Sequence, residues 1–172
     1  SSTSSTCAAP SMARCRPDGP PAAPPVAAPA GFDPQPAGQL AWPTRLAPGP
    51  DRTLWVSDAV SGRVAGYRGG RLVASLSGLD RPLGVATDGR LLYVGVAGTG
   101  SLEAWDVATG RHAATLAPAG SLRMPNAVAV GPDGRVWVVD SVADRVRSWN
   151  PDGTEGPALG GTGDADGRFR FP

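Results

Sequence analysis

The sequence predicts an all-β fold of short antiparallel strands, and three observations lead to this prediction. From Trp42 onward, apolar residues alternate with polar ones or form short runs bounded by turns such as Asp88-Gly89 and Pro132-Asp133-Gly134. One such pattern of runs and turns recurs three times along the chain. Helical periodicity is absent from the sequence. Short apolar runs joined by tight Gly and Asp turns are typical of antiparallel hairpins.

The register of the repeat is fixed by two columns of aromatic residues. One column is Trp55, Tyr93 and Trp137, and the other is Tyr67, Trp105 and Trp149. Both columns advance by 38 and then by 44 positions, so two independent markers give the same register. Each copy holds four apolar segments within roughly 40 residues, which is the pattern of a propeller blade. We therefore expect a β-propeller of four-stranded antiparallel blades, three of them visible at about 42–80, 81–123 and 124–171.

The individual strands are expected at the apolar segments of each copy. In the first copy they are 43–48, 53–58, 63–68 and 71–76. In the second copy they are 83–87, 91–96, 102–106 and 112–116. In the third copy they are 126–130, 135–140, 145–149 and about 156–159.

The third copy carries a family resemblance. Its segments Pro125-Asn-Ala-Val-Ala-Val, Asp133-Gly-Arg-Val-Trp-Val-Val-Asp140 and Asp144-Arg-Val-Arg-Ser-Trp149 resemble the NHL repeat. The first copy shares the second and third of these segments, through Asp58 and Arg63. The second copy departs from the NHL pattern, because Val96 stands where Asp is expected. It is more similar to the related YVTN propeller repeat. The resemblance implies the propeller fold and says little about function.

NHL-like propellers usually close as rings of six blades, so the three copies are expected to be part of such a ring. Gly160–Pro172 resembles the connection that leads into a fourth blade. An open arc would expose strand edges and the apolar faces that stack between blades. Three explanations are open: the sequence is part of a longer chain, which we favour, or two chains pair into one ring, or a partner covers the open side.

Residues 1–41 differ in composition from residues 42–172. This Ser, Ala and Pro-rich arm holds nine of the 19 prolines. Such a stretch cannot bury enough apolar surface to offset the entropy of ordering it. Its proline runs favour polyproline II, so we expect an irregular extended linker, or a strap that docks on partner subunits.

The cysteines suggest an exported protein. Cys7 and Cys15 both lie in the arm, where they could close one small disulfide loop, and the predicted blades carry no thiol. Lipidation of Cys7 is disfavoured, because Ser4, Ser5 and Thr6 precede it. No stretch reaches the ~20 apolar residues of a membrane span. We expect a periplasmic or extracellular location, with the signal peptide not included in this sequence.

The charge pattern disfavours nucleic acid as a partner. Formal net charge is +1, and the 16 basic residues are all arginine. Because the sequence lacks both Lys and Ile, the arginine bias indicates a G+C-rich genome more than a recognition surface. The densest basic group, Arg123, Arg145 and Arg147, has Asp140 and Asp144 among it. No basic stripe emerges.

Two charged pairs recur at one spacing. Asp58 precedes Arg63, and Asp140 precedes Arg145, each at the turn from the second to the third strand of a copy. A rim of such charges could bind a ligand. Recurrence once per repeat instead favours a structural role, in which Asp accepts hydrogen bonds from turn amides while Arg lies across the neighbouring strand.

An enzymatic alternative depends on few residues. Asn126 is similar in position to the metal-binding Asn of gluconolactonase-like propellers, but Thr44 and Leu83 occupy that position in the other copies. A hard cation needs several oxygen ligands. His112 is the one histidine, and no G-x-S-x-G motif accompanies it. We therefore expect no catalytic residue, no metal and no cofactor.

These observations together favour a non-enzymatic, extracytoplasmic scaffold. Its partners would be other protein subunits of a larger, membrane-associated complex, which contact the arm and the open blade edge. The alternative is a truncated metal-dependent lactonase-like or streptogramin-lyase-like enzyme.

Overall fold

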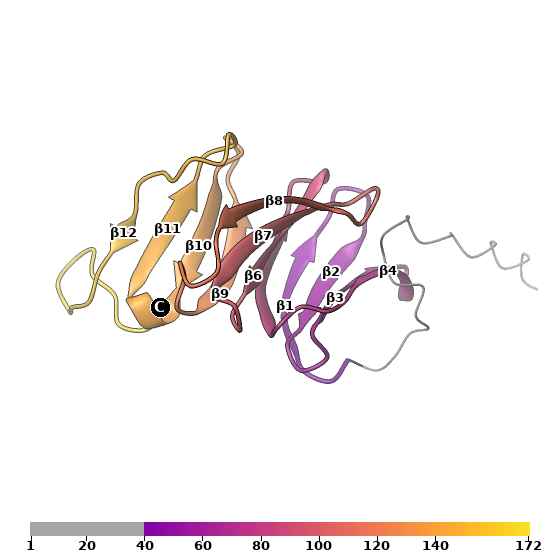
Figure 1. The fold of residues 1–172 in the computed structure, drawn as a ribbon, viewed down its shortest axis with the longest axis horizontal. Helices are drawn as coiled ribbons and strands as arrows, with labels where there is room; N and C mark the ends of the chain where they lie inside the picture. The colour runs from indigo at the N-terminus through magenta and orange to yellow at the C-terminus, as the bar shows by residue number, and fades with distance from the viewer. Residues whose placement is uncertain (1–39) are drawn as a thin grey trace, which may run out of the picture.

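The computed structural model describes residues 40–172, so the expectations for the arm, including the Cys7–Cys15 pair, lie outside the described residues. The described part consists of three four-stranded antiparallel sheets that stand side by side (Figure 1). Within residues 40–172 no helix has the length and apolar character needed to cross a bilayer. The predicted all-β architecture of four-stranded blades is confirmed.

The strands follow one another outward within each blade. Blade 1 contains β1 (Pro43–Pro48), β2 (Leu54–Asp58), β3 (Arg63–Arg68) and β4 (Arg71–Leu76). Blade 2 contains β5 (Pro82–Thr87), β6 (Leu91–Val96), β7 (Ser101–Asp106) and β8 (His112–Ala117). Blade 3 contains β9 (Pro125–Val130), β10 (Val136–Asp140), β11 (Arg145–Trp149) and β12 (Leu159–Gly160), with a short 3₁₀ helix η1 (Ser141–Ala143) between β10 and β11.

The last strand is the clearest difference from the sequence-based expectation. A strand was expected at about 156–159, but β12 covers only Leu159 and Gly160, which pair with Val146 and Arg145. Before β12, Glu155 pairs with Trp149 only as an isolated bridge, and Pro157 has no N–H to donate to the ladder. After Leu159, the positive φ values of Gly160 and Gly161 end the extended conformation. The outer edge of blade 3 is therefore shorter than that of the other two blades.

The apolar core lies between the blades. Strand β5 contacts both β1 and β9, so the first strands of the three blades are neighbours. Blades 1 and 2 share a core of Ala47, Trp55, Val64, Ala74, Leu76, Val85, Leu92, Val94, Val96 and Trp105. Blades 2 and 3 share a core of Tyr93, Leu102, Ala104, Ala117, Leu122, Val136, Val138 and Trp149. Each pair of neighbouring blades therefore encloses one apolar core between its facing sheets.

The three blades form an open arc, and among the described residues no further blade packs on the outer face of blade 1 or on the outer face of blade 3. In blade 3, Val136 and Val138 point toward blade 2, so Trp137 points to the opposite face and is only half-buried. Trp55, at the same repeat position in blade 1, is 2% exposed because blade 2 packs on it. On the outer face of blade 1, Leu54 is 38% exposed, while its counterpart Leu92 is fully buried. Both outer faces have the residues of an inter-blade core.

Asp58 and Asp140 each accept hydrogen bonds from backbone N–H groups at the start of their own blade. Asp58 is fully buried and accepts hydrogen bonds from the backbone N–H groups of Ala41 and Trp42, both at 2.8 Å. Asp140 is 2% exposed and accepts from the N–H groups of Arg123 and Met124, the latter at 2.8 Å. In both blades, the end of the second strand therefore holds the two amides that precede the proline of the first strand.

Blade 2 replaces this aspartate with Val96 and closes the same junction by another route. The N–H of Ala97 donates to the Arg81 carbonyl at 3.0 Å, as the N–H groups of Ala59 and Ser141 do to Trp42 and Met124 in the other blades. The bond found in blade 2 in addition is from the N–H of Gly98 to the Asp80 carbonyl, at 2.9 Å. A Cβ on Gly98 would come within 2.0 Å of the Asp80 carboxyl carbon, so a side chain here would have to displace that group. Gly98, two residues after Val96, therefore supplies a backbone bond at the junction that lacks the carboxylate.

The repeated arginines differ from each other. Arg63 Nε lies 3.7 Å from the buried Asp58 carboxylate, an ion pair across neighbouring strands that is longer than a hydrogen bond. Arg145 is the ladder partner of Asp140, but its side chain is exposed, and no ion pair between the two is found in the described part of the chain. The turn between the second and third strands donates an amide only to Asp58, through Ser61 N at 3.4 Å, whereas the bonds of Asp140 come from the segment before β9. Among the described residues, the Arg contact likewise occurs at Arg63 and not at Arg145.

Tyr93 offers a test of the core between blades 2 and 3. Burial, followed by the neighbouring Asp88 carboxylate that accepts its hydroxyl bond at 3.1 Å, raises the pKa of Tyr93 to about 12. An unfolded tyrosine ionises near ~10. Its contribution to stability is therefore complete below pH ~10 and is lost as the pH rises toward the folded pKa.

We expect Tyr93→Phe to remove this alkaline loss. The measurement is the phenolate absorbance of the native protein as a function of pH, compared with that of Tyr93→Phe. The difference between the two curves should titrate about two pH units above free tyrosine. A difference that titrates near pH ~10 would show that Tyr93 is not held in a closed core.

Candidate functional site

The most distinctive surface of the arc lies at the edge where each blade begins. Four residues directly precede the prolines that open the repeats: Trp42, Arg81, Met124 and Phe171. Trp42 and Phe171 are each 63% exposed. Two further apolar residues, Val60 in the β2–β3 turn and Val142 in η1, are 68% and 45% exposed. We call these six residues the pre-proline face.

The repeat explains why these side chains share one edge. Because β1, β5 and β9 are equivalent strands, the residues before them emerge at the same end of each blade, beside the turn after the second strand. In Figure 1 this is the lower edge, where η1 and the C-terminus lie. Ser141 Oγ donates to the Pro172 carbonyl at 2.5 Å, and Phe171 N donates to Asp144 Oδ1 at 2.7 Å. These bonds hold Phe171 beside η1.

The backbone of this edge is strained at two of the four positions. Arg81 and Phe171 have φ values of 55° and 49°. Non-glycine residues seldom adopt positive φ, and a residue before proline normally prefers extended conformations. Such conformations cost on the order of 1–3 kcal/mol and concentrate at functional sites. The strained conformation and the exposed apolar side chains therefore coincide at the same edge.

A hollow of about 640 Å³ opens within the pre-proline face. Its lining includes Trp42, Val60, Arg81, Arg123, Met124 and Val142. All three blades contribute to it, so it exists only in the assembled arc. Aromatic residues, Met and Arg are the residue types enriched at protein–protein interfaces.

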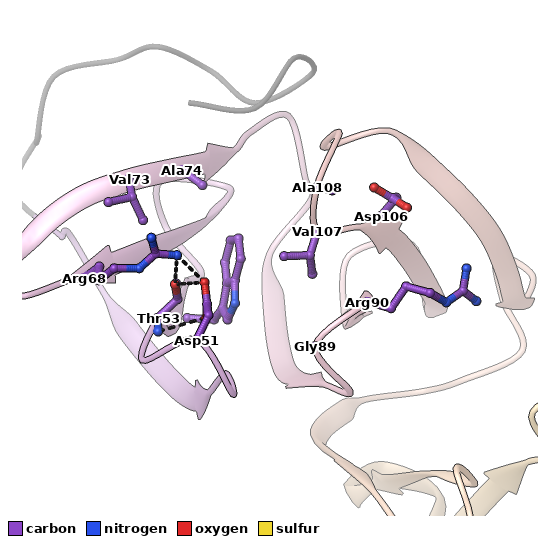
Figure 2. Close-up of a pocket in the computed structure, with 11 residues that line it drawn as sticks. Asp51, Thr53, Arg68, Val73, Ala74, Gly89, Arg90, Asp106, Val107 and Ala108 are labelled. Carbon is purple, nitrogen blue, oxygen red and sulfur yellow. Dashed lines mark hydrogen bonds and ion pairs between the residues drawn. The ribbon is translucent and has the colours of Figure 1, made fainter. Parts of the chain in front are cut away.

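A second hollow, of about 480 Å³, lies between blades 1 and 2 (Figure 2). Figure 2 shows Arg68 directed at Asp51 and Thr53 on one wall, with Val107 on the other. Asp51 accepts bonds from Thr53 N at 3.1 Å and Thr53 Oγ1 at 2.9 Å, and from Arg68. Burial alone would raise the pKa of Asp51, but the bonds from Thr53 and the charge of Arg68 outweigh it and lower the pKa.

The hollow in Figure 2 is better explained by blade geometry than by a ligand. A similar gap of about 270 Å³ recurs between blades 2 and 3, where Tyr93 and Val136 replace Trp55 and its neighbours. Of the charged residues that line the larger hollow, Asp51 and Arg68 form an ion pair, and Asp106 accepts bonds from Thr109. A gap that recurs at each junction is expected where stacked sheets diverge toward the outer edge.

His112 has partners, but they do not form a catalytic relay. Its Nε2 lies 2.8 Å from Glu103 Oε2 and 3.4 Å from Thr115 Oγ1. Thr115 Oγ1 donates directly to Glu103 at 2.5 Å. A nucleophile–base–acid relay uses the two ring nitrogens for two different partners. Here one nitrogen faces both, so the hydroxyl proton of Thr115 is committed to the carboxylate.

Asn126 is held by an arginine. Arg45 Nη2 donates to Asn126 Oδ1 at 2.8 Å, and Arg45 Nη1 donates to the Thr44 carbonyl at 2.9 Å. The amide oxygen that would bind a cation is thus directed at a guanidinium. Within residues 40–172, no group of three or more carboxylate, imidazole or thiol side chains is arranged to hold a metal ion.

The other residues singled out from the sequence lie in cores and junctions. Trp55, Tyr93, Trp105 and Trp149 are buried between blades, whereas Tyr67 and Trp137 lie half-buried on the two outer faces. The guanidinium of Arg147 lies 5.0 Å from the ring centroid of Trp149, and that of Arg135 lies 5.7 Å from that of Trp137. The pre-proline face was not singled out from the sequence, although every member but the two valines is marked by the proline that follows it.

Comparison with solved structures supports the fold. The chain is similar to Kuenenia stuttgartiensis hydrazine synthase, with 19% identity and a TM-score of 0.63, over 74% of this chain and 38% of that one. It is similar to Staphylococcus aureus virginiamycin B lyase, with 13% identity and a TM-score of 0.59, over 70% of this chain and 42% of that one. A chain of the nidogen/laminin complex gives 20% identity and a TM-score of 0.57, over 65% and 45%.

These neighbours are propeller-type proteins. The chain has the fold of propeller blades. It spans less than half the length of each of the three. Two are named as enzymes, and the third is named for a complex between proteins, so the shared fold serves both kinds of function. No family model matches the chain, and no curated protein matches it in sequence.

Proposed function

We propose that this chain is a non-enzymatic interaction module of an exported, multi-subunit complex, and that it binds another protein through the pre-proline face. The observation that carries the proposal is the exposure of Trp42, Val60, Val142 and Phe171 on one edge built by all three blades. Scattered exposed apolar residues are ordinary, but a group of this kind around a hollow marks an interaction site.

The finer parts of the proposal have separate support. An NHL-type propeller is favoured by the amide-binding aspartates Asp58 and Asp140, which stand at the acidic position of that repeat. Export to the periplasm or the extracellular space is favoured by cysteine usage, with both thiols in the arm. The proline-rich arm is proposed to dock on partner subunits, and the apolar outer faces around Leu54 and Trp137 offer further contact area.

Site-specific photocrosslinking tests the proposed interaction. A photoreactive phenylalanine analogue is placed at Trp42 in the chain expressed in its own host. We expect a discrete crosslinked protein, because a buried aromatic at an interface lies within contact distance of the partner. The matched control is the same analogue at Ala113, which is exposed on β8 in the outer edge of blade 2.

Two outcomes would contradict the proposal. Crosslinks of equal yield from Trp42 and Ala113 would show that the pre-proline face is not preferred. Turnover of a lactone or a streptogramin by the chain, lost on Asn126→Ala or His112→Ala, would favour the lyase-like alternative instead.

A further inference from the structure

The hollow of the pre-proline face has an uneven distribution of charge. Arg81 and Arg123 line it, both exposed, and no carboxylate among residues 40–172 forms an ion pair with either. The nearby carboxylates of Asp58 and Asp140 are buried and accept hydrogen bonds from the backbone. Both arginines are thus exposed, and the Arg81 guanidinium makes one long bond of 3.4 Å to the Ala97 carbonyl, while the carboxylates of Asp58 and Asp140 are buried.

One lining carboxylate remains, that of Asp80. Its carboxyl group lies directly over the Cα of Gly98, at the place where a Cβ of that residue would stand. The lining offers two guanidiniums against this single carboxylate, so the hollow is complementary to a negatively charged group.

The apolar groups of the hollow define the rest of the ligand. Trp42 and Val60 contribute from blade 1, and Met124 and Val142 contribute from blade 3, with Arg81 between them in blade 2. Stacked sheets lie about 10 Å apart, so a path across three blades is about 20–30 Å long. An extended peptide covers that length with roughly six to nine residues. A ligand with alternating apolar and acidic side chains would match this order.

The chain's own arm is a poor match for this site. Its charged residues are Arg14, Arg16, Asp18 and Asp33, which cancel each other. Nucleic acid is also a poor match, because two arginines beside Asp80 do not form a track for successive phosphates. An acidic segment of another protein fits both the charge and the apolar lining.

We propose that the hollow binds an extended acidic segment of a partner protein, with carboxylates on Arg81 and Arg123 and an apolar side chain between Trp42 and Met124. This inference rests on the proposed interaction function and specifies the partner's chemistry. Arginine forms paired hydrogen bonds with carboxylates, so each guanidinium would select an acidic side chain by geometry as well as by charge.

A peptide library displayed on phage provides the probe. The wild-type chain is the selection target, and the double variant Arg81→Gln with Arg123→Gln is the counter-target. We expect the recovered peptides to carry at least two Asp or Glu residues beside a large apolar residue. Recovered peptides without an acidic excess, or an equal recovery on the double variant, would overturn the inference.

Fluorescence anisotropy with one recovered peptide then measures the contribution of each side chain. We expect Arg81→Gln and Arg123→Gln each to weaken binding about tenfold, and replacement of Glu by Gln in the peptide to weaken it at least as much. Binding should also weaken as salt rises. The control is Arg71→Gln, an exposed arginine at the start of β4, on the opposite edge of blade 1. An equal effect of Arg71→Gln would overturn the inference.

The two levels of proposal can fail separately. If photocrosslinking from Trp42 captures a partner while the arginine variants leave peptide selection unchanged, the interaction module stands and the acidic segment is wrong. If Trp42 gives no discrete crosslink and no peptide is recovered, both are wrong. Near-ultraviolet circular dichroism of each variant shows whether its core packing is retained.

Discussion

Trp55→Ala is expected to lower the free energy of unfolding by about 4 kcal/mol, the cost of removing a fully buried indole from a packed core. Trp55 is 2% exposed and packs between blades 1 and 2 with Leu92 and Trp105. Its equivalent Trp137 is half-buried on the outer face of blade 3. Trp137→Ala should therefore cost only about 1–2 kcal/mol in a chain with that face uncovered. Urea unfolding of the two variants measures the difference.

This pair of variants also reports what covers blade 3. The two tryptophans occupy one repeat position, so their intrinsic strand preferences and local neighbours are closely matched. If Trp137→Ala cost as much as Trp55→Ala in the isolated chain, the outer face would be covered, for instance by a second copy. A concentration-dependent midpoint for Trp137→Ala would identify self-association as that cover.

Asp58→Ala is expected to lower the free energy of unfolding by about 3 kcal/mol, because the two backbone N–H groups that it binds would lose a charged acceptor in a buried site. These are the N–H groups of Ala41 and Trp42, each 2.8 Å from the carboxylate. The control is Asp166→Ala, which removes an exposed carboxylate for which no hydrogen bond is found in the described chain. Chemical denaturation at neutral pH measures both, and a cost for Asp58→Ala as small as that of the control would contradict the prediction.

The same carboxylate predicts an acid dependence of stability. Burial would raise the pKa of Asp58, but the bonds donated by the backbone of Trp42 and Ala41 and by Ser61 outweigh it and lower the pKa. The stabilising contribution is therefore present above the unfolded pKa of ~4 and is lost as the pH falls through the folded pKa. The difference in stability between wild type and Asp58→Ala should shrink below pH ~4.

Sequence periodicity was sufficient to predict the strands. Short hairpins with Gly and Asp turns depend on local sequence, which is why eleven of the observed strands begin within one residue of the expected position. The exception is β12, which begins only after Pro157, a residue that has no N–H for the ladder. Local pattern thus determined the secondary structure almost completely.

The surface could not be predicted in the same way. Trp55 and Trp137 carry the same sequence signal but have different burial, because burial depends on whether another blade follows. Arg63 and Arg145 also share a spacing, yet an ion pair to the repeated aspartate is present only at Arg63. The pre-proline face brings together Trp42 and Met124, about 80 residues apart in the sequence, which only the stacking of blades could show. Such features are properties of the assembled arc.

The hydrogen bond from the Trp42 N–H to the Asp58 carboxylate, which we call a clasp, has a consequence for the order of folding. It joins residues only 16 positions apart, and the clasp between Asp140 and Met124 spans the same interval. Contacts of such short range form quickly, and nascent chains tend to fold from the N-terminus as they are synthesised. Blade 1 can therefore close its clasp while blade 3 is still inside the ribosome. A partner that needs Met124 as well as Trp42 would then recognise only chains whose third blade has emerged and docked, which would make binding a check on completed folding.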